Sequence, residues 1–230
     1  MADQDSLTPR VFIFRHGETE WAKSGRFTSF TEIDLTPAGV AQVTSAAPLL
    51  VGQGKLIDPE RLSRVIVSPR MRARTTMKLL FSHYLPRVCE EKVTYTEDIT
   101  EWNYGDYEGL KKDEIRQLVR DKGWGKQREW DVWTERVSGR SVQQVTDRLD
   151  KLISQIKEIQ RPHMRGPEPC DILLVITHGL ILRCFVKRWL GFGISDHFPI
   201  MFETGAVGIL SYKNNDVEQP SLHVGVPLCC

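Results

Sequence analysis

The sequence has few cysteines, almost no net charge and no long apolar run, and each shortage excludes a class of protein. Its five cysteines among 230 residues have neither the even number of a disulfide framework nor the spacing of a metal site. A formal net charge of +1 offers no concentrated basic surface, so we expect no nucleic-acid partner. No stretch is long and apolar enough to span a bilayer, so we expect no membrane association.

The ends of the chain carry no clear targeting signal. The opening MADQDSLTPR lacks the basic start and apolar run of a signal peptide, so we expect a cytoplasmic protein that could also enter the nucleus. Cys229 and Cys230 follow no polybasic segment, and we interpret them as a tail rather than a lipidation signal. The length and the 40% hydrophobic content fit one globular domain over residues 1–230, of undefined oligomeric state.

Short apolar runs alternate with amphipathic segments along the chain. The runs typical of buried strands are Val11–Phe14, Val65–Val67, Ile172–Ile176 and Ala206–Tyr212. Helical spacing marks a segment that starts at Thr36-Pro37, and then residues 70–82, 142–159 and 180–190. This order predicts an α/β fold, a three-layer sandwich with a mostly parallel central sheet and helices on both faces. The polar span of about residues 99–139 is expected to lie outside the core, as a lid-like insertion.

Histidines and arginines follow three of the expected strands. Arg15 and His16 follow the first strand, residues 68–70 the second, and His178 the third. Ligands collect at the carboxyl ends of parallel strands, so we expect these residues to converge. An unprotonated histidine can attack phosphorus, and arginine matches phosphate oxygens with a permanent charge. Because phosphoryl transfer needs mainly positioning and charge neutralisation, arginines can replace a metal, and we expect neither a metal nor another cofactor.

Five segments resemble, in order, those of the histidine phosphatase superfamily, which includes cofactor-dependent phosphoglycerate mutases. They are Arg15-His16-Gly17-Glu18-Thr19 with Trp21, Leu35-Thr36-Pro37-Ala38-Gly39, Ser68-Pro69-Arg70-Met71-Arg72-Ala73 with Thr75, Asp98-Ile99-Thr100-Glu101 with Gly105 and Glu108-Gly109, and Thr177-His178-Gly179. A single short triplet would be weak, whereas chance does not readily produce five ordered blocks that cover most of the chain.

The resemblance implies a catalytic role for five residues. His16 would be the nucleophile that becomes phosphohistidine. Arg15, Arg72 and His178 would surround the phosphoryl group and stabilise its charge. Glu101 would protonate the leaving oxygen and later help to activate water, which requires a raised pKa.

Other segments resemble the sugar-bisphosphatase branch of this family, of the sedoheptulose-1,7-bisphosphatase type. The longest runs through residues 101–109, and further matches lie at residues 8–10, 23–25, 68–74 and 208–212, with Trp130 and Trp133. By this resemblance Ser24, Thr28, Tyr104 and Arg183 would contact the substrate, a small phosphorylated metabolite. Arg183 is also a charge in a mostly apolar helix, where either a phosphate partner or a position at the helix edge would accommodate it.

Several residues bear on which family member this is. Ala22 and the run of residues 130–133 depart from the pattern of the mutases, whereas Ser29 replaces a glycine expected in the bisphosphatase. Arg70 is compatible with a surface charge or with a substrate contact. The leading prediction is a metal-independent phosphatase, a phosphoric monoester hydrolase that acts on a sugar (bis)phosphate. A phosphoglycerate mutase and a non-catalytic interaction protein with the same fold remain as alternatives.

Overall fold

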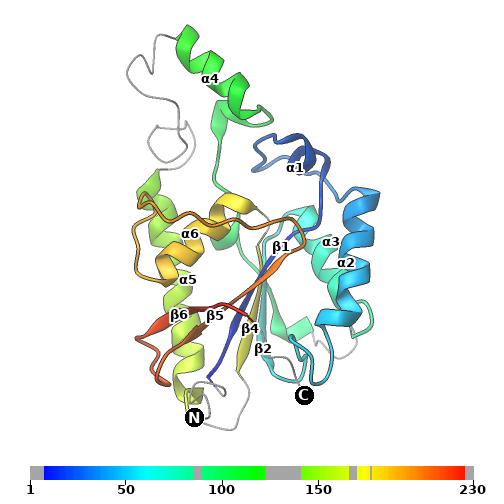
Figure 1. The fold of residues 1–230 in the computed structure, drawn as a ribbon, viewed down its shortest axis with the longest axis vertical. Helices are drawn as coiled ribbons and strands as arrows, with labels where there is room; N and C mark the ends of the chain where they lie inside the picture. The colour runs from blue at the N-terminus through cyan, green and yellow to red at the C-terminus, as the bar shows by residue number, and fades with distance from the viewer. Residues whose placement is uncertain (1–7, 85–89, 123–140, 166–169, 177, 226–230) are drawn as a thin grey trace.

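The structure, a computed structural model, describes residues 8–84, 90–122, 141–165, 170–176 and 178–225. Within them, six strands form one sheet between two layers of helices (Figure 1). The strands are β1 (Val11–Arg15), β2 (Leu62–Val67), β3 (Val93–Tyr95), β4 (Asp171–Ile176), β5 (Val207–Tyr212) and β6 (Pro220–His223). The predictions that concern Trp130, Trp133, Thr177, Cys229 and Cys230 fall outside the described residues.

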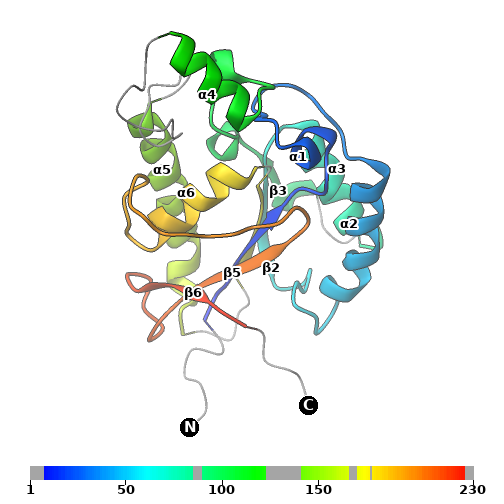
Figure 2. The same ribbon diagram turned by 45° about the horizontal axis from the view of Figure 1, so that its top comes forward.

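Helices cover both faces of the sheet. Helices α5 and α6 lie on one face and α2 and α3 on the other (Figures 1 and 2). The α-helices are α1 (Glu20–Ser24), α2 (Pro37–Leu50), α3 (Met71–Leu80), α4 (Lys112–Asp121), α5 (Val142–Gln160) and α6 (Gly179–Trp189), and the 3-10 helices are Glu90–Lys92, Glu97–Ile99, Gly105–Tyr107 and Arg161–His163. In the described part of the chain, no helix has the length and apolar character needed to cross a membrane.

The strand order is β3-β2-β4-β1-β5-β6. Strand β1 is parallel to β4, and β2 is parallel to both β4 and β3. Strand β5 runs antiparallel to β1 and to β6. The predicted α/β sandwich with a mostly parallel sheet is therefore confirmed, and the antiparallel β5 is the departure from a purely parallel arrangement.

Strand β1 shows why its sequence is a continuous apolar run. Val11 and Ile13 pack into the cluster that includes side chains of α5 and α6. Phe12 and Phe14 point the other way, into the cluster with α2 and α3. Successive side chains of a strand face opposite sides, so a strand covered on both sides has apolar residues at every position.

The described part of the span of about residues 99–139, which is residues 99–122, contributes side chains to the core, contrary to the expectation that the span lies outside it. Ile99, Trp102 and Tyr107 are buried, and α4 buries Ile115 and Val119. These apolar residues are separated by charged ones, so the average polarity of the span concealed them. The first part of the span thus packs against the molecule, and α4 lies beyond the carboxyl ends of the strands (Figure 1).

The segment that precedes α2 holds the loop after β1 in place. Thr36 caps α2 by accepting a hydrogen bond from the Gly39 N–H, as predicted, and its hydroxyl donates to Oε1 of Glu18 at 2.8 Å. A side chain at Gly39 would put its Cβ 2.2 Å from the Glu18 carbonyl oxygen. Only glycine allows this close approach, which fixes the chain immediately after His16.

Candidate active site

A cavity of about 420 Å³ lies at the carboxyl ends of β1 and β4. Its volume is within the usual range for sites that bind small molecules. Seven of the nine predicted site residues line it: Arg15, His16, Thr28, Glu101, Tyr104, His178 and Arg183. The topology thus brings together residues that are far apart in the sequence, as the strand-end argument predicts.

His16 is a buried, neutral imidazole. Its Nδ1 lies 2.6 Å from the carbonyl oxygen of Gly17, and because a carbonyl only accepts, Nδ1 must carry the proton. Burial lowers the pKa of His16 to about 3, and the charges of Arg72 and Arg15 add to this effect, although the Gly17 hydrogen bond opposes it. Near neutral pH, Nε2 of His16 therefore keeps an unprotonated lone pair.

His178 lies beside His16 and is held by Arg72. The centroids of the two histidine rings are 5.4 Å apart, at an angle of 71° between the ring planes. Arg72 donates from Nε to Nε2 of His178 at 3.2 Å, so Nε2 accepts and Nδ1 carries the proton. Burial and the charge of Arg72 lower the pKa of His178 well below its usual range, so this ring is also neutral.

Arg72 is fully buried and lies behind His178 rather than in the cavity wall. It donates to the carbonyl oxygens of Thr31 at 2.8 Å and Ser29 at 2.9 Å. Burial lowers the pKa of Arg72 to about 10, which still leaves the guanidinium charged near neutral pH. Its positive charge therefore lies directly behind His178, where it adds to the electrostatic potential in the cavity.

Glu101 has a buried carboxyl group that lies against the first backbone N–H groups of α6. It accepts hydrogen bonds from the backbone N–H groups of Trp102 at 2.8 Å, Ile181 at 3.0 Å and Leu180 at 3.3 Å. Burial raises the pKa of Glu101 to about 7, against the opposing effect of these hydrogen bonds and of Arg148. A carboxyl group with this pKa can both give and take a proton near neutral pH.

Arg148 is a residue near the site that the motifs do not identify. It projects from α5 and donates from Nη1 to Thr100 Oγ1 and to the Glu97 carbonyl, both at 3.0 Å. Its position on the helix, three residues after Val145 and four before Leu152, places a charge on the buried face of α5. This charge on the otherwise apolar face of the predicted helix was the feature of the sequence that could have identified Arg148.

The loop around Ser29 is tied to the segment that carries Glu101. The Glu108 carboxylate accepts hydrogen bonds from the N–H groups of Ser29 and Thr31 and from the Ser29 hydroxyl. Although burial opposes it, these bonds lower the pKa of Glu108. Ser29, which replaces an expected glycine, thus uses its hydroxyl to hold the loop whose carbonyl groups bind Arg72.

Two other residues lie away from the cavity. Ser24 does not line it, and its hydroxyl donates within α1 to the carbonyl oxygen of Glu20 at 2.8 Å. Arg70 forms ion pairs with Glu32 at 3.0 Å and Glu97 at 3.1 Å, which favours the surface-charge interpretation of this residue.

Thr76, rather than Thr75, is the threonine that supports the site. Its hydroxyl accepts a hydrogen bond from the Gly17 N–H at 3.1 Å and donates to the Arg72 carbonyl at 2.7 Å. The alignment of the third block on Thr75 was therefore off by one residue. Two cations in the cavity wall, Arg26 and Lys112, were also missed, because neither belongs to a recognised block.

Within the described residues, no group of three or more histidine, cysteine, aspartate or glutamate side chains could hold a metal ion.

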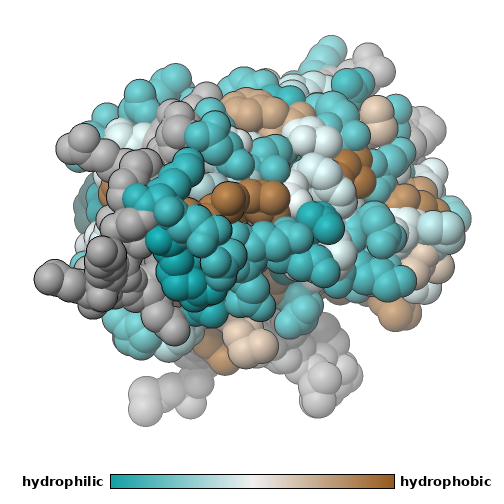
Figure 3. All heavy atoms as spheres, turned by 90° about the horizontal axis from the view of Figure 1, so that it is seen from above, coloured by the Kyte–Doolittle hydropathy of each residue, from teal (hydrophilic) through white to brown (hydrophobic). Residues whose placement is uncertain are grey.

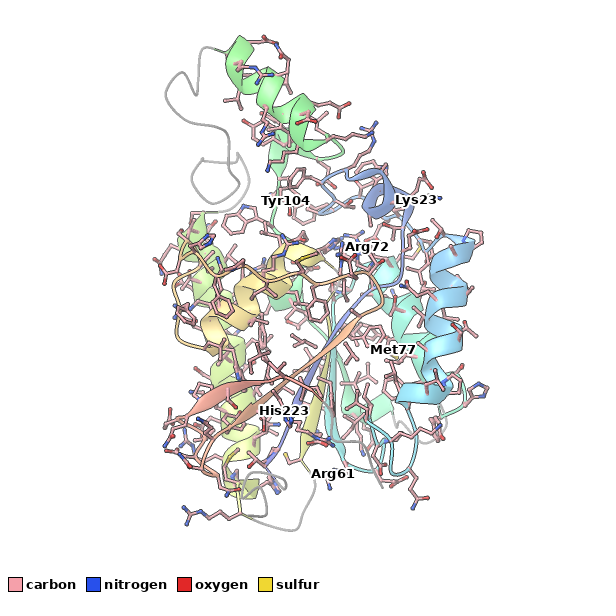
Figure 4. All side chains as sticks on the ribbon, in the orientation of Figure 1. Lys23, Arg61, Arg72, Met77, Tyr104 and His223 are labelled. Atoms are coloured by element: carbon pink, nitrogen blue, oxygen red, sulfur yellow. The ribbon has the colours of Figure 1, made fainter. Side chains whose placement is uncertain are left out.

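The face that carries α4, seen from above in Figure 3, is mostly hydrophilic with scattered apolar residues. Arg72 and Tyr104 lie between the carboxyl end of the sheet and α4 (Figure 4). The cavity therefore brings together a neutral histidine that could act as a nucleophile, positive charge, and a carboxyl group that could donate a proton.

Comparison with known proteins shows matches over nearly the whole chain. The family model of the histidine phosphatase superfamily (branch 1) matches residues 11–223. The sedoheptulose 1,7-bisphosphatase of Saccharomyces cerevisiae is 31% identical, over 96% of this chain and 94% of its own. An acid phosphatase of Mycobacterium tuberculosis is 34% identical, over 89% of this chain and 87% of its own. A solved open reading frame product of Mycobacterium tuberculosis, 31% identical, matches the fold with a TM-score of 0.72 and covers 94% of this chain and 96% of its own.

Proposed function

Because this chain belongs to the histidine phosphatase superfamily and is a phosphoric monoester hydrolase, we propose that it dephosphorylates a small sugar phosphate through a phosphohistidine on His16. The observation that carries this proposal is the protonation state of His16. Its Nδ1 proton is held by the Gly17 carbonyl, and its Nε2 lone pair is available in the cavity wall. A neutral imidazole with one fixed proton is a competent nucleophile toward phosphorus.

In the first step, Nε2 of His16 forms a bond to phosphorus while the bond from phosphorus to the ester oxygen breaks. Glu101, whose pKa of about 7 leaves it partly protonated near neutrality, gives its proton to the departing oxygen. In the second step, water attacks phosphorus, its proton passes to Glu101, and the N–P bond breaks to release phosphate. One carboxyl group thus serves as acid and then as base.

Positive charge and polar hydrogens around the phosphoryl group stabilise both transition states. Arg15 and His178 line the cavity beside His16, and Arg72 adds its charge through its contact with His178. Equatorial phosphoryl oxygens carry most of the charge in such a reaction, so fixed donors lower its barrier without a metal ion. We therefore assign Arg15, Arg72 and His178 to charge stabilisation in a metal-independent reaction.

The substrate class is proposed from the sugar bisphosphatase relative and from the character of the cavity. Thr28, Tyr104 and Arg183 line it and are assigned to the substrate, whereas Ser24 could act only by changing its present hydrogen bond within α1. We also take the whole chain as one domain, in which about residues 99–139 form a lid-like insertion whose described part both lines the cavity and contributes to the core. In this assignment the binding partner is a small phosphorylated metabolite.

The proposal is tested by phosphate release from a panel of sugar monophosphates, sugar bisphosphates and 3-phosphoglycerate, with a chelator present throughout. We expect rapid release from at least one sugar phosphate and no dependence on added metal. Uniformly slow release, together with isomerisation of 3-phosphoglycerate when a bisphosphorylated primer is added, would instead identify a mutase.

A further inference from the structure

Arg70 lies outside the cavity, between two segments that belong to the site. Its Nη1 donates to Oε1 of Glu32 at 3.0 Å, and its Nη2 donates to the carboxylate of Glu97 at 3.1 and 3.2 Å. Glu32 belongs to the loop of residues 29–32, whereas Glu97 begins the segment of residues 97–101. Arg70 is therefore a surface charge whose two partners come from separate parts of the site.

The loop of residues 29–32 is held by two arginines that lie two positions apart in the sequence. Arg72 donates to the carbonyl oxygens of its first and third residues. Arg70 contacts the other two residues, because it pairs with Glu32 and its Cζ lies 5.2 Å from the centre of the Phe30 ring. Glu32 also accepts a hydrogen bond from the first N–H of α3 at 2.8 Å, where a negative charge is favourable. Arg70 thus helps to hold the loop that holds Arg72.

The other partner, Glu97, is bonded through its backbone to the residue that precedes the proposed acid. The Glu97 carbonyl oxygen accepts hydrogen bonds from the N–H of Thr100 at 3.2 Å and from its hydroxyl at 2.8 Å. Arg148 donates to the same carbonyl oxygen at 3.0 Å. A displacement of Glu97 would therefore move Thr100, and with it Glu101.

Glu101 lies between two points at which its segment is attached to the same loop. The first attachment, at Glu97, is made through Arg70. The second, at Glu108, is made by the hydrogen bonds that its carboxylate accepts from N–H groups of the loop of residues 29–32. Proton transfer requires the acid to lie within hydrogen-bond reach of the leaving oxygen, so the position of this segment matters for catalysis.

We propose that Arg70 is a positioning residue, which keeps the Glu101 carboxyl group aligned with the leaving oxygen of the substrate. This inference rests on the proposed role of Glu101 as the acid and adds to it a residue outside the cavity. The side chain of Arg70 is 16% exposed, and those of Glu32 and Glu97 are 41% and 56% exposed. Such partly exposed ion pairs contribute modestly, so the loss of Arg70 should weaken the alignment without abolishing activity.

The test measures kcat and KM of wild-type protein and Arg70→Met on two aryl phosphates, p-nitrophenyl phosphate and phenyl phosphate. Phenoxide is the poorer leaving group, so its departure depends more on proton donation. We expect kcat on phenyl phosphate to fall about 3- to 10-fold, the size expected for two partly exposed ion pairs. KM should be nearly unchanged, and p-nitrophenyl phosphate should show little loss.

Three further variants make the comparison specific. Arg74→Met removes the same charge one turn further along α3, where Arg74 lies over the Tyr95 ring, and should leave both rates unchanged. Arg70→Lys keeps the charge but cannot reach both carboxylates with a planar fork, so its loss should be intermediate. Glu97→Gln removes one ion pair at an exposed carboxylate and should reproduce part of the loss, whether or not Arg70→Met folds well.

A double-mutant cycle with Glu101→Gln separates positioning of the acid from a general structural role. If Arg70 acts through Glu101, Arg70→Met should add almost no further loss to Glu101→Gln on phenyl phosphate. An additive loss, or equal losses on the two esters in Arg70→Met, would overturn the inference while the proposed function stands. Equal losses on the two esters in Glu101→Gln alone would show that Glu101 is not the acid, and would overturn both.

Discussion

Oε2 of Glu101 lies 3.9 Å from Nδ1 of His178. Since Arg72 donates to Nε2 of that ring, Nδ1 is the protonated nitrogen and the one nearer the carboxyl group. Both residues are almost fully buried, at 4% and 5% exposed. In the proposed mechanism, the proton donor for the leaving group and a neutral donor for the phosphoryl oxygens are therefore neighbours in one desolvated site, where electrostatic effects are strong.

Replacement of Glu101 is expected to separate substrates by their leaving groups. Glu101→Gln should slow hydrolysis of a sugar phosphate by about 10²–10⁴-fold, because its alkoxide needs a proton as it departs. An activated aryl phosphate, whose leaving group needs no proton, should lose much less. Equal losses on both substrates would exclude Glu101 as the acid.

The pKa of Glu101 also predicts the pH profile. The carboxyl group must be protonated to act as the acid in the first step, so kcat/KM for a sugar phosphate should fall as pH rises through about 7. His16 stays unprotonated down to about pH 3, so it should not limit the rate between these values. In Glu101→Gln the decline near pH 7 should disappear, and its persistence would assign that limb to another group.

Arg148 is expected to set the pH at which this alkaline decline in activity occurs. Its charge helps to lower the pKa of Glu101, so Arg148→Met should move the alkaline decline to higher pH. Arg148→Lys retains the charge and should leave the decline close to its wild-type position. A purely structural role would lower the melting temperature of both variants without moving either profile.

Loss of Arg72 should reduce turnover more than substrate binding. The guanidinium donates hydrogen bonds to three residues, His178, Ser29 and Thr31. A lysine side chain cannot reproduce this planar set of donors. Arg72→Lys should therefore misplace His178 and lower kcat by about 10²–10³-fold, an effect of the size that removal of one oxyanion donor has. Steady-state kinetics on protein verified as folded by circular dichroism would measure it, and a wild-type kcat would contradict the assignment.

Gly39 should be intolerant of even one added methyl group. The Cβ of Gly39→Ala would lie 2.2 Å from the Glu18 carbonyl oxygen, so either the loop after His16 or the start of α2 must shift. We expect a loss of about 1–3 kcal/mol in the free energy of unfolding. The control Ala38→Ser, at the exposed neighbouring position, should change it by less than about 0.5 kcal/mol. Denaturant titration of both variants tests this, and equal stabilities would contradict the packing argument.

The ends of the strands were predictable from the sequence, because each apolar run stops where helical spacing of the apolar residues begins. Apolar runs followed by helical spacing located β1, β2 and β4, and Arg15, His16 and His178 follow directly from where the first and third runs end. The ordered motifs then supplied Arg72 and Glu101. The antiparallel direction of β5 was not predictable, because its apolar pattern is the same in either direction.

Contacts between segments that are distant in the sequence were the features of the site that could not be predicted. Lys112 reaches the cavity only because residues 109–110 pair with Phe27, a backbone interaction that leaves no mark on side-chain type. The third block was matched on Thr75 rather than on Thr76, and the hydrogen bond that Thr76 accepts from the Gly17 N–H identifies the threonine that contacts the site. The glycine in the second block was recognised as part of a motif, but its physical reason, contact with Glu18, required the fold.

The central claim is that phosphate passes through His16, and rapid quenching tests it most directly. Wild-type protein mixed with a sugar phosphate that carries a radiolabelled phosphate group should acquire label within one turnover. The label should be lost in acid, survive in alkali and map by mass spectrometry to the peptide that contains His16. His16→Ala, folded and chelator-treated in the same way, should acquire none and release no phosphate. Labelling of a different residue, or undiminished phosphate release by His16→Ala, would contradict the account.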